Sequence, residues 1–133
     1  VLASRNLKEL QKICKEIKAT GGESICVKAD VANEKEVENI CIKAIEAFGT
    51  IDTWVNNAGT SIYGKLVNLD IEDEKRLFDV NFWGVRHGCR VAVEALKKYG
   101  GVIINVGSEV SERAIPLQGI YSATKHAVKA YTE

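Results

Sequence analysis

The sequence has no excess of charge of either sign. Its 133 residues include 18 Lys and Arg and 18 Asp and Glu, which gives a formal net charge of zero. Proteins that bind nucleic acid or anionic membranes usually present a basic excess, and an acidic tail would appear as a run of like charges. We therefore expect neither a nucleic-acid partner nor a membrane partner.

Long apolar runs are also missing. The longest runs have the length of a β-strand, well short of the roughly 18 residues that a membrane span needs, and the first residues do not resemble a signal peptide. A cytoplasmic location is the expectation that follows.

Clustered metal-ligand residues are absent as well. The four cysteines stand far apart, without a C-x-x-C pair: Cys14, Cys26, Cys41 and Cys89. This spacing disfavours both a zinc site and a compact disulfide framework. His87 and His126 have no companions at ligand spacing, so the sequence predicts no metal site.

The chain does contain short apolar runs that alternate with helical patterns. Strands are expected at 1–3, 25–29, 51–55 and 102–106, and helices from Leu7, after Asn33, from Asp70 and around Tyr121. This alternation is typical of parallel strands joined by right-handed crossovers. The predicted class is α/β, a doubly wound, Rossmann-like parallel sheet, in a single partial domain over residues 1–133.

Three helices have a predicted inward stripe, and Asn33 with Glu36 has the spacing of a capping box. The stripes are Leu10, Ile13, Cys14 and Ile17; then Val37, Ile40, Cys41, Ala44, Ile45 and Phe48; then Leu77, Val80, Val85, Cys89, Val93 and Leu96.

Tyr121 and Lys125 are four residues apart, which places them on one face of a helix. A phenol is a poor acid or base near neutral pH, but a neighbouring ammonium favours the phenolate. Ser108 lies thirteen positions before Tyr121, just after the last apolar run, where its hydroxyl can point at the same spot. Such a trio suits proton transfer to the oxygen of a carbonyl or carbinol.

With Asn56-Asn57-Ala58-Gly59 and Asn81 upstream, this trio resembles the short-chain dehydrogenase/reductase family, classical type, over nearly the whole chain. The resemblance implies that Tyr121 is the general acid/base and that Ser108 stabilises the substrate oxygen. It also implies that Lys125 tunes Tyr121, and that Asn81 bends its helix and holds a water that relays protons to the lysine. The expected reaction interconverts a secondary alcohol and a ketone or aldehyde by hydride transfer.

By the same resemblance, several residues border a nicotinamide dinucleotide: Asp30, Val31, Asn57, Ala58, Gly59, Tyr121 and Lys125. Asp30 would contact the adenine ring, and Lys125 would bind the hydroxyls of the nicotinamide ribose. Read without the family, Asn57 to Gly59 is an ordinary turn and Asp30 a polar strand end.

Ser4-Arg5 stands where the preceding strand ends, the position at which an acid would bind the 2′-hydroxyl of the adenosine ribose. No acid is present there. Arginine can instead bind a 2′-phosphate, with Ser4 as a second donor, so we expect NADP rather than NAD. An arginine in the first turn of a helix is also common as solvated surface.

Some questions stay open on the sequence alone. Rival functions are an extended-type epimerase or dehydratase, which shares Tyr-x-x-x-Lys, and a catalytically silent nucleotide-binding protein. Glu109 directly follows Ser108 and either faces the substrate or points to solvent. The substrate is a small carbonyl or alcohol compound of unspecified identity, and the family's interfaces imply a homodimer or homotetramer.

No glycine-rich phosphate-binding turn, G-x-x-x-G-x-G or G-x-G-x-x-G, occurs in the chain. In the family order 3-2-1-4-5, the strand before this turn would lie between the pair ending at Ala3 and Ala29 and the pair ending at Val55 and Val106. We therefore expect a fold that is incomplete at both ends, and that residues 1–133 alone neither turn over substrate nor bind NADP tightly.

Overall fold

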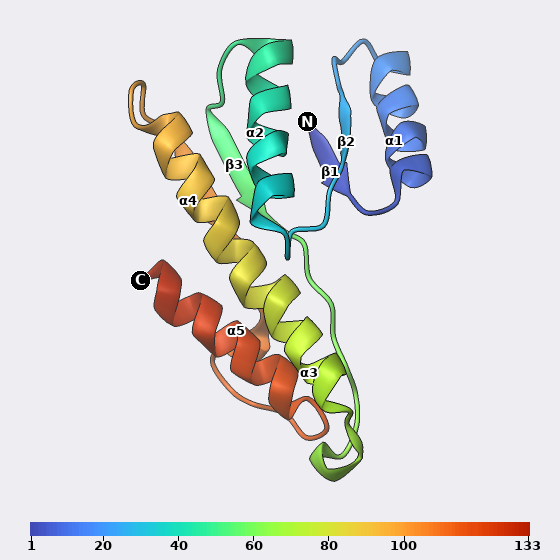
Figure 1. The fold of residues 1–133 in the computed structure, drawn as a ribbon, viewed down its shortest axis with the longest axis vertical. Helices are drawn as coiled ribbons and strands as arrows, with labels where there is room; N and C mark the ends of the chain where they lie inside the picture. Colours follow the sequence, from blue (N-terminus) through green and yellow to red (C-terminus); the bar gives the residue numbers. More distant parts are fainter.

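The computed structural model describes all residues from 1 to 133, in four strands and five α-helices (Figure 1). The elements in chain order are β1 (Leu2–Ser4), α1 (Leu7–Ala19), β2 (Cys26–Lys28), α2 (Glu34–Phe48), β3 (Thr53–Asn56), α3 (Ile71–Phe78), α4 (Gly84–Leu96), β4 (Val102–Asn105) and α5 (Gly119–Thr132). Two short 3₁₀ turns, η1 (Leu66–Asn68) and η3 (Glu109–Ser111), and a π turn, η2 (Asp79–Trp83), complete the chain.

The strands form two separate parallel pairs. β1 pairs with β2, with Ala3 opposite Val27, and β3 pairs with β4, with Val55 opposite Ile104. No strand of one pair is hydrogen-bonded to a strand of the other. The expected strand pairs and the α/β class are confirmed, although each strand differs from its expected bounds by one or two residues.

Three helices begin at a side-chain cap, which explains where they start. Asn6 accepts a hydrogen bond from Glu9 N at 3.3 Å, Asn33 from Lys35 N at 3.1 Å, and Asp70 from Glu72 N at 2.8 Å. The capping box predicted for Asn33 and Glu36 is wrong in two details. Asn33 Oδ1 accepts from Lys35 N instead of Glu36 N, and the Glu36 carboxylate accepts from Asp30 N, at 2.7 Å, instead of the Asn33 N–H. Glu36 therefore fixes the strand-to-helix turn as well as the helix.

The long helix expected from Asp70 is interrupted. α3 and α4 are continuous in direction, but the π turn Asp79–Trp83 lies between them, as the middle of the long rod in Figure 1. A π turn adds one residue to the helical repeat and often marks a functional position. Here it contains Asn81.

Two apolar clusters lie against the two strand pairs. Val27, Ala29 and Ile40 form one, and Val85, Cys89 and Val128 form the other. The predicted stripes are only partly buried: Ile13, Ile45, Phe48 and Val93 are 45%, 44%, 39% and 52% exposed. Helical spacing identifies the face of a helix, but nothing in the structure covers these four positions of the stripes.

Because no strand pairing joins the two halves, helix contacts hold them together. Glu34 at the start of α2 accepts from Arg86 and Arg90 on α4, at 3.0 and 2.9 Å. Val31 packs so closely on α4 that a Cβ at Gly84 would lie 2.7 Å from Val31 Cγ2. Gly84 thus permits the close approach of the two halves.

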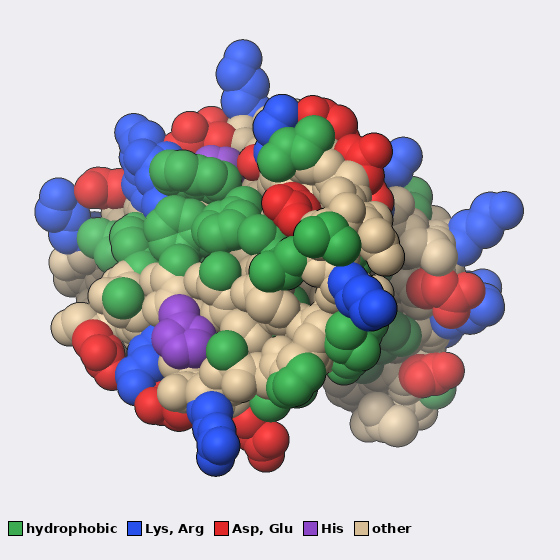
Figure 2. All heavy atoms as spheres, turned by 90° about the horizontal axis from the view of Figure 1, so that it is seen from below, with side chains coloured by type: hydrophobic (Ala, Val, Ile, Leu, Met, Phe, Trp, Pro, Cys, Tyr) green, Lys and Arg blue, Asp and Glu red, His purple; other side chains and the backbone are tan.

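The view in Figure 2 shows hydrophobic side chains gathered in a band, with charged residues around it. The segments before α3 and before α5 meet at this end of the molecule, where Gly64 N donates to Leu117 O at 2.9 Å. Their exposed apolar residues include Tyr63, Val67 and Leu117. No helix combines the length and apolar character that crossing a membrane requires.

Gly88 on α4 provides a test of the packing of the second half. A methyl group there would overlap Asn56 Oδ1 and lie 2.8 Å from Trp54 Nε1. Alanine in a helix is normally favoured over glycine, but we expect Gly88→Ala to lower the free energy of unfolding of the full-length protein by about 1–3 kcal/mol, because the core is overpacked. Urea unfolding measures the change. Gly107→Ala is the control, since its new methyl meets only Ser111 Oγ, at 3.5 Å. Equal stability of the two variants would contradict this packing.

Candidate active site

Ser108 follows β4 and begins the turn η3. Its Oγ accepts a hydrogen bond from Val110 N at 3.4 Å, and its own N–H donates to Ser111 Oγ at 3.1 Å. The Ser108 hydroxyl donates to no group of the chain, so its proton is free for a substrate oxygen. Ser111 is 6% exposed, and its role in fixing this turn was not predicted from the sequence.

Tyr121 and Lys125 both lie on α5, four residues apart as predicted. Lys125 is 6% exposed, and its Nζ donates to Val106 O at 2.8 Å. Burial lowers the pKa of Lys125, because removal from water disfavours its charged form. Tyr121 is half-buried, and its hydroxyl has no hydrogen-bond partner within the chain. The lysine therefore attaches α5 to the end of β4, and the phenol is free to meet a ligand.

Asn81 is completely buried, and all of its amide hydrogen bonds are directed at other segments. Its Oδ1 accepts from Thr60 N at 2.8 Å, and its Nδ2 donates to Thr60 O at 2.8 Å and to Thr124 Oγ1 at 3.1 Å. Thr124 Oγ1 in turn donates to Tyr121 O at 2.7 Å. Asn81 therefore joins the segment after β3 to the helix of Tyr121 and Lys125. Asn81 lies within the π turn that interrupts the helix, and the bend and the water relay stay predictions.

A cleft of about 850 Å³ lies between the two strand pairs and runs along β1 and β3, from Phe48 and Asp52 before β3 to the strand ends. The part along the strands is where the family order 3-2-1-4-5 places a further strand, and the part at the carboxyl ends is the candidate ligand site. Most of the residues predicted to bind a cofactor line it: Ser4, Arg5, Asp30, Val31, Asn57, Ala58 and Gly59. Ligands of open α/β sheets bind at such strand ends.

The cleft reaches the catalytic residues at one end only. Ser108, Tyr121 and Lys125 are not part of its lining. A methyl group at Gly59 would nevertheless lie 3.9 Å from Lys125 Nζ and 3.5 Å from Asn81 Oδ1. The lysine therefore adjoins the Gly59 end of the cleft. At the carboxyl ends of the strands, Ala58 and Gly59 leave the backbone open, and Arg5 and Arg76 add guanidinium groups. A phosphate-bearing dinucleotide needs this combination of open backbone and positive charge.

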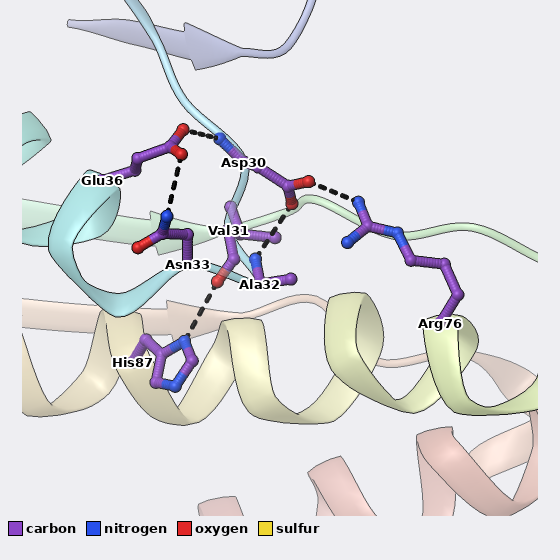
Figure 3. A network of polar contacts seen from close by, with 7 residues as sticks. All are labelled: Asp30, Val31, Ala32, Asn33, Glu36, Arg76 and His87. Atoms are coloured by element: carbon purple, nitrogen blue, oxygen red, sulfur yellow. Dashed lines mark hydrogen bonds and ion pairs between the residues drawn. The ribbon is translucent and has the colours of Figure 1, made fainter. Parts of the chain in front are cut away.

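Side chains from the three helices α2, α3 and α4 contact the turn that follows β2 (Figure 3). The Asp30 carboxylate accepts from Ala32 N at 3.0 Å and pairs with Arg76 on α3 at 2.6 Å. His87 Nδ1 on α4 lies 3.0 Å from Val31 O, and Glu36 on α2 holds Asp30 N. Burial of Asp30 opposes its charged form, but the Ala32 N–H and the Arg76 guanidinium outweigh this effect, and the pKa of Asp30 is lowered.

Sequence reasoning found Asp30 but missed its partners. Arg76 and His87 lie 46 and 56 positions away from the residues they contact, and neither belongs to a recognisable motif. Glu36 was singled out by its capping-box spacing, although for another contact. Glu109 is exposed and forms no ion pair, and no group of three or more His, Cys, Asp or Glu side chains is placed to hold a metal ion.

The comparisons with known proteins agree with this geometry. An uncharacterized oxidoreductase of Bacillus subtilis, YxnA, is 43% identical over 135 residues, which cover 100% of this chain and 38% of that protein. An alcohol dehydrogenase of Thermococcus sibiricus, solved in complex with 5-hydroxy-NADP, superposes with a TM-score of 0.92 at 34% identity and covers 98% of this chain and 56% of its own. A short chain dehydrogenase/reductase of Burkholderia phymatum, solved in complex with NAD, gives a TM-score of 0.95 at 35% identity, with 98% and 47% covered.

This chain thus spans about 38% of the length of the curated relative, and 56% and 47% of the two solved chains. The family model described as short chain dehydrogenase matches residues 1–133. The chain belongs to the short-chain dehydrogenase/reductase family of oxidoreductases.

Proposed function

We propose that the protein is an NADP-dependent oxidoreductase that interconverts a secondary alcohol and a ketone or aldehyde. One observation supports this above all: the buried ammonium of Lys125, on the helix of Tyr121, adjoins Gly59 at the strand ends, where Arg5 and Asp30 also line the cleft. This brings an acid/base group close to a hydride source, which is what carbonyl reduction requires.

Tyr121 is the general acid/base of the reaction. In the reducing direction its hydroxyl gives a proton to the carbonyl oxygen, and in the oxidising direction the phenolate takes the proton of the alcohol. The unengaged proton of Ser108 donates to the same oxygen and stabilises the negative charge that develops on it. The nicotinamide, when bound, supplies or accepts the hydride.

Lys125 and Asn81 prepare this site. The positive charge of Lys125 stabilises negative charge on Tyr121 and binds the hydroxyls of the nicotinamide ribose. The Val106 carbonyl, which accepts from Nζ, keeps the ammonium between the helix and the cleft. Asn81 is the start of a proton relay through water to Lys125. Its Oδ1 would lie 3.5 Å from a methyl group at Gly59, beside the lysine, and this closeness supports that role.

The cofactor is NADP(H), because the residues at the end of β1 bring positive charge to the cleft. No acid stands at the end of β1, and Arg5 lines the cleft there beside Ser4. A guanidinium is suited to a 2′-phosphate, whereas a carboxylate would bind a free 2′-hydroxyl. The complex of the Thermococcus sibiricus protein with 5-hydroxy-NADP supports this choice, and the NAD complex of the Burkholderia phymatum protein supports the alternative.

The protein acts in the cytoplasm as a homodimer or homotetramer. Trp83, Val93 and Tyr131, near and on helices α4 and α5, are 46%, 52% and 45% exposed, and a second copy would cover them. Phe82 packs edge-on against both Trp83 and Tyr131, so these rings are held in a fixed arrangement.

Replacing Tyr121 tests the central role. In the full-length protein, Tyr121→Phe should lower kcat by about a hundredfold or more, because general acid/base catalysis contributes on that scale, with little change in cofactor affinity. Steady-state kinetics with calorimetric NADP⁺ titration separate the two effects. Tyr131→Phe, at the exposed end of the same helix, is the control. Near-normal turnover of Tyr121→Phe would refute the assignment.

Lys125 should affect both binding and rate. Lys125→Met keeps the length of the side chain but removes its charge, so we expect weaker NADP⁺ binding together with a kcat at least about tenfold lower. The control is Lys129→Met, since Lys129 pairs with Glu112 at the surface of α5. A fall in kcat with unchanged NADP⁺ affinity would show that Lys125 does not bind the cofactor.

Arg5 should determine cofactor choice. Arg5→Ala removes the guanidinium at the end of β1, and the affinity for NADP⁺ should fall about tenfold or more while that for NAD⁺ stays nearly constant. Lys12→Ala, which removes only the exposed pair with Glu9, is the matched control. Equal affinity of the unmutated protein for both nucleotides would contradict the NADP assignment.

A further inference from the structure

Arg5 and Asp30 lie side by side at the cleft. Ala29 N donates to Ser4 O at 3.0 Å, which joins the carboxyl ends of the parallel strands β1 and β2. Arg5 follows Ser4 and Asp30 follows Ala29, so these two residues are neighbours. Both line the cleft, and the positive charge of Arg5 is among the influences that lower the pKa of Asp30. The proposed phosphate-binding guanidinium therefore has a carboxylate as its neighbour.

A carboxylate in that position opposes phosphate binding in two ways. It repels the phosphate directly, and it offers Arg5 a competing partner inside the protein. At distances below the Debye length of about 8–10 Å, salt does not remove either effect. An uncompensated Asp30 would cancel the charge that Arg5 brings to the cleft.

Arg76 compensates that carboxylate. Its guanidinium lies 2.6 Å from Asp30 Oδ2, with side chains 37% and 29% exposed, and it reaches the cleft from α3, on the far side of Asp30 from β1 (Figure 3). Arg5, Asp30 and Arg76 together carry a net charge of +1. Without Arg76 the net charge of Arg5 and Asp30 is zero, and the Asp30 carboxylate is available to pair with Arg5.

We propose that Arg76 is a positioning residue that determines cofactor choice: by pairing with Asp30, it leaves Arg5 free to bind the 2′-phosphate of NADP. This inference rests on the proposed NADP function. Arg76 itself need not touch the nucleotide. Its effect passes through Asp30, so removing the Asp30 charge should make Arg76 dispensable.

The experiment measures NADP⁺ and NAD⁺ binding to the full-length protein by isothermal titration calorimetry, without turnover. We expect Arg76→Met to weaken NADP⁺ binding about fivefold or more and to change NAD⁺ binding less than about twofold. The double variant Asp30→Asn/Arg76→Met should recover most of the lost preference, measured as the ratio of NADP⁺ to NAD⁺ affinity, because any adenine contact of Asp30 affects both nucleotides alike. Arg76→Lys, which keeps the charge, should retain the preference. A structural defect would weaken both nucleotides and would not be rescued by Asp30→Asn.

Arg90→Met is the matched control. It removes an arginine whose partner Glu34 keeps a second contact with Arg86, and it lies away from the cleft. Its NADP⁺ and NAD⁺ affinities should equal those of the unmutated protein. Two results would overturn this inference alone. One is an Arg76→Met variant that keeps the preference for NADP⁺, and the other is a double variant whose preference for NADP⁺ is as weak as that of Arg76→Met. Equal affinity of the unmutated protein for both nucleotides would overturn the NADP assignment and this inference together.

Discussion

The buried amide of Asn81 is the interaction on which the site depends. A buried amide must form its hydrogen bonds within the protein, because leaving them unmade costs about 1–3 kcal/mol each. Asn81 forms three, two of them to the backbone of Thr60 and one to Thr124. These bonds hold the segment after β3 against α5, and the π turn presents the amide to both. The positions of Gly59 and Lys125, whose Nζ would lie 3.9 Å from a methyl group at Gly59, follow from this attachment.

A second constraint sets how the two halves are joined. The two strand pairs are not hydrogen-bonded to each other, so the halves are joined by α2 against α4 and by the turn after β2. The strand ends line one part of the space between them, with Arg5 and Asp30 from one half and Gly59 from the other. The polar contacts of Asp30 and Val31 hold one wall of this space, and Lys125 stands at its other end. The proposed cofactor-binding residues thus come from both halves of the molecule, and the proposed catalytic residues come from the half that contains β3 and β4.

Local spacing predicted the parts of this structure that depend on local geometry. Tyr121 and Lys125 share a helix, Asn33 and Asp70 cap helices, and the strand pairs and the α/β class follow from the order of apolar runs. Spacing failed where a distant partner decides. The pairing of Asp30 with Arg76 has no local signal, and periodicity marked Val93 as inward although nothing covers it. The resemblance to a family identified Asn81 as a site residue, but the threonines that bind it are visible only in the fold.

The central claim is that a carbonyl compound is reduced at Tyr121 with hydride from NADPH. The most direct measurement is the absorbance of NADPH in the presence of the full-length protein and a panel of ketones and aldehydes. The account predicts that NADPH is consumed only when a carbonyl compound is added, and that one alcohol is formed for each NADPH lost. Tight NADPH binding without consumption for any carbonyl compound would contradict it, and would identify a nucleotide-binding protein without this activity.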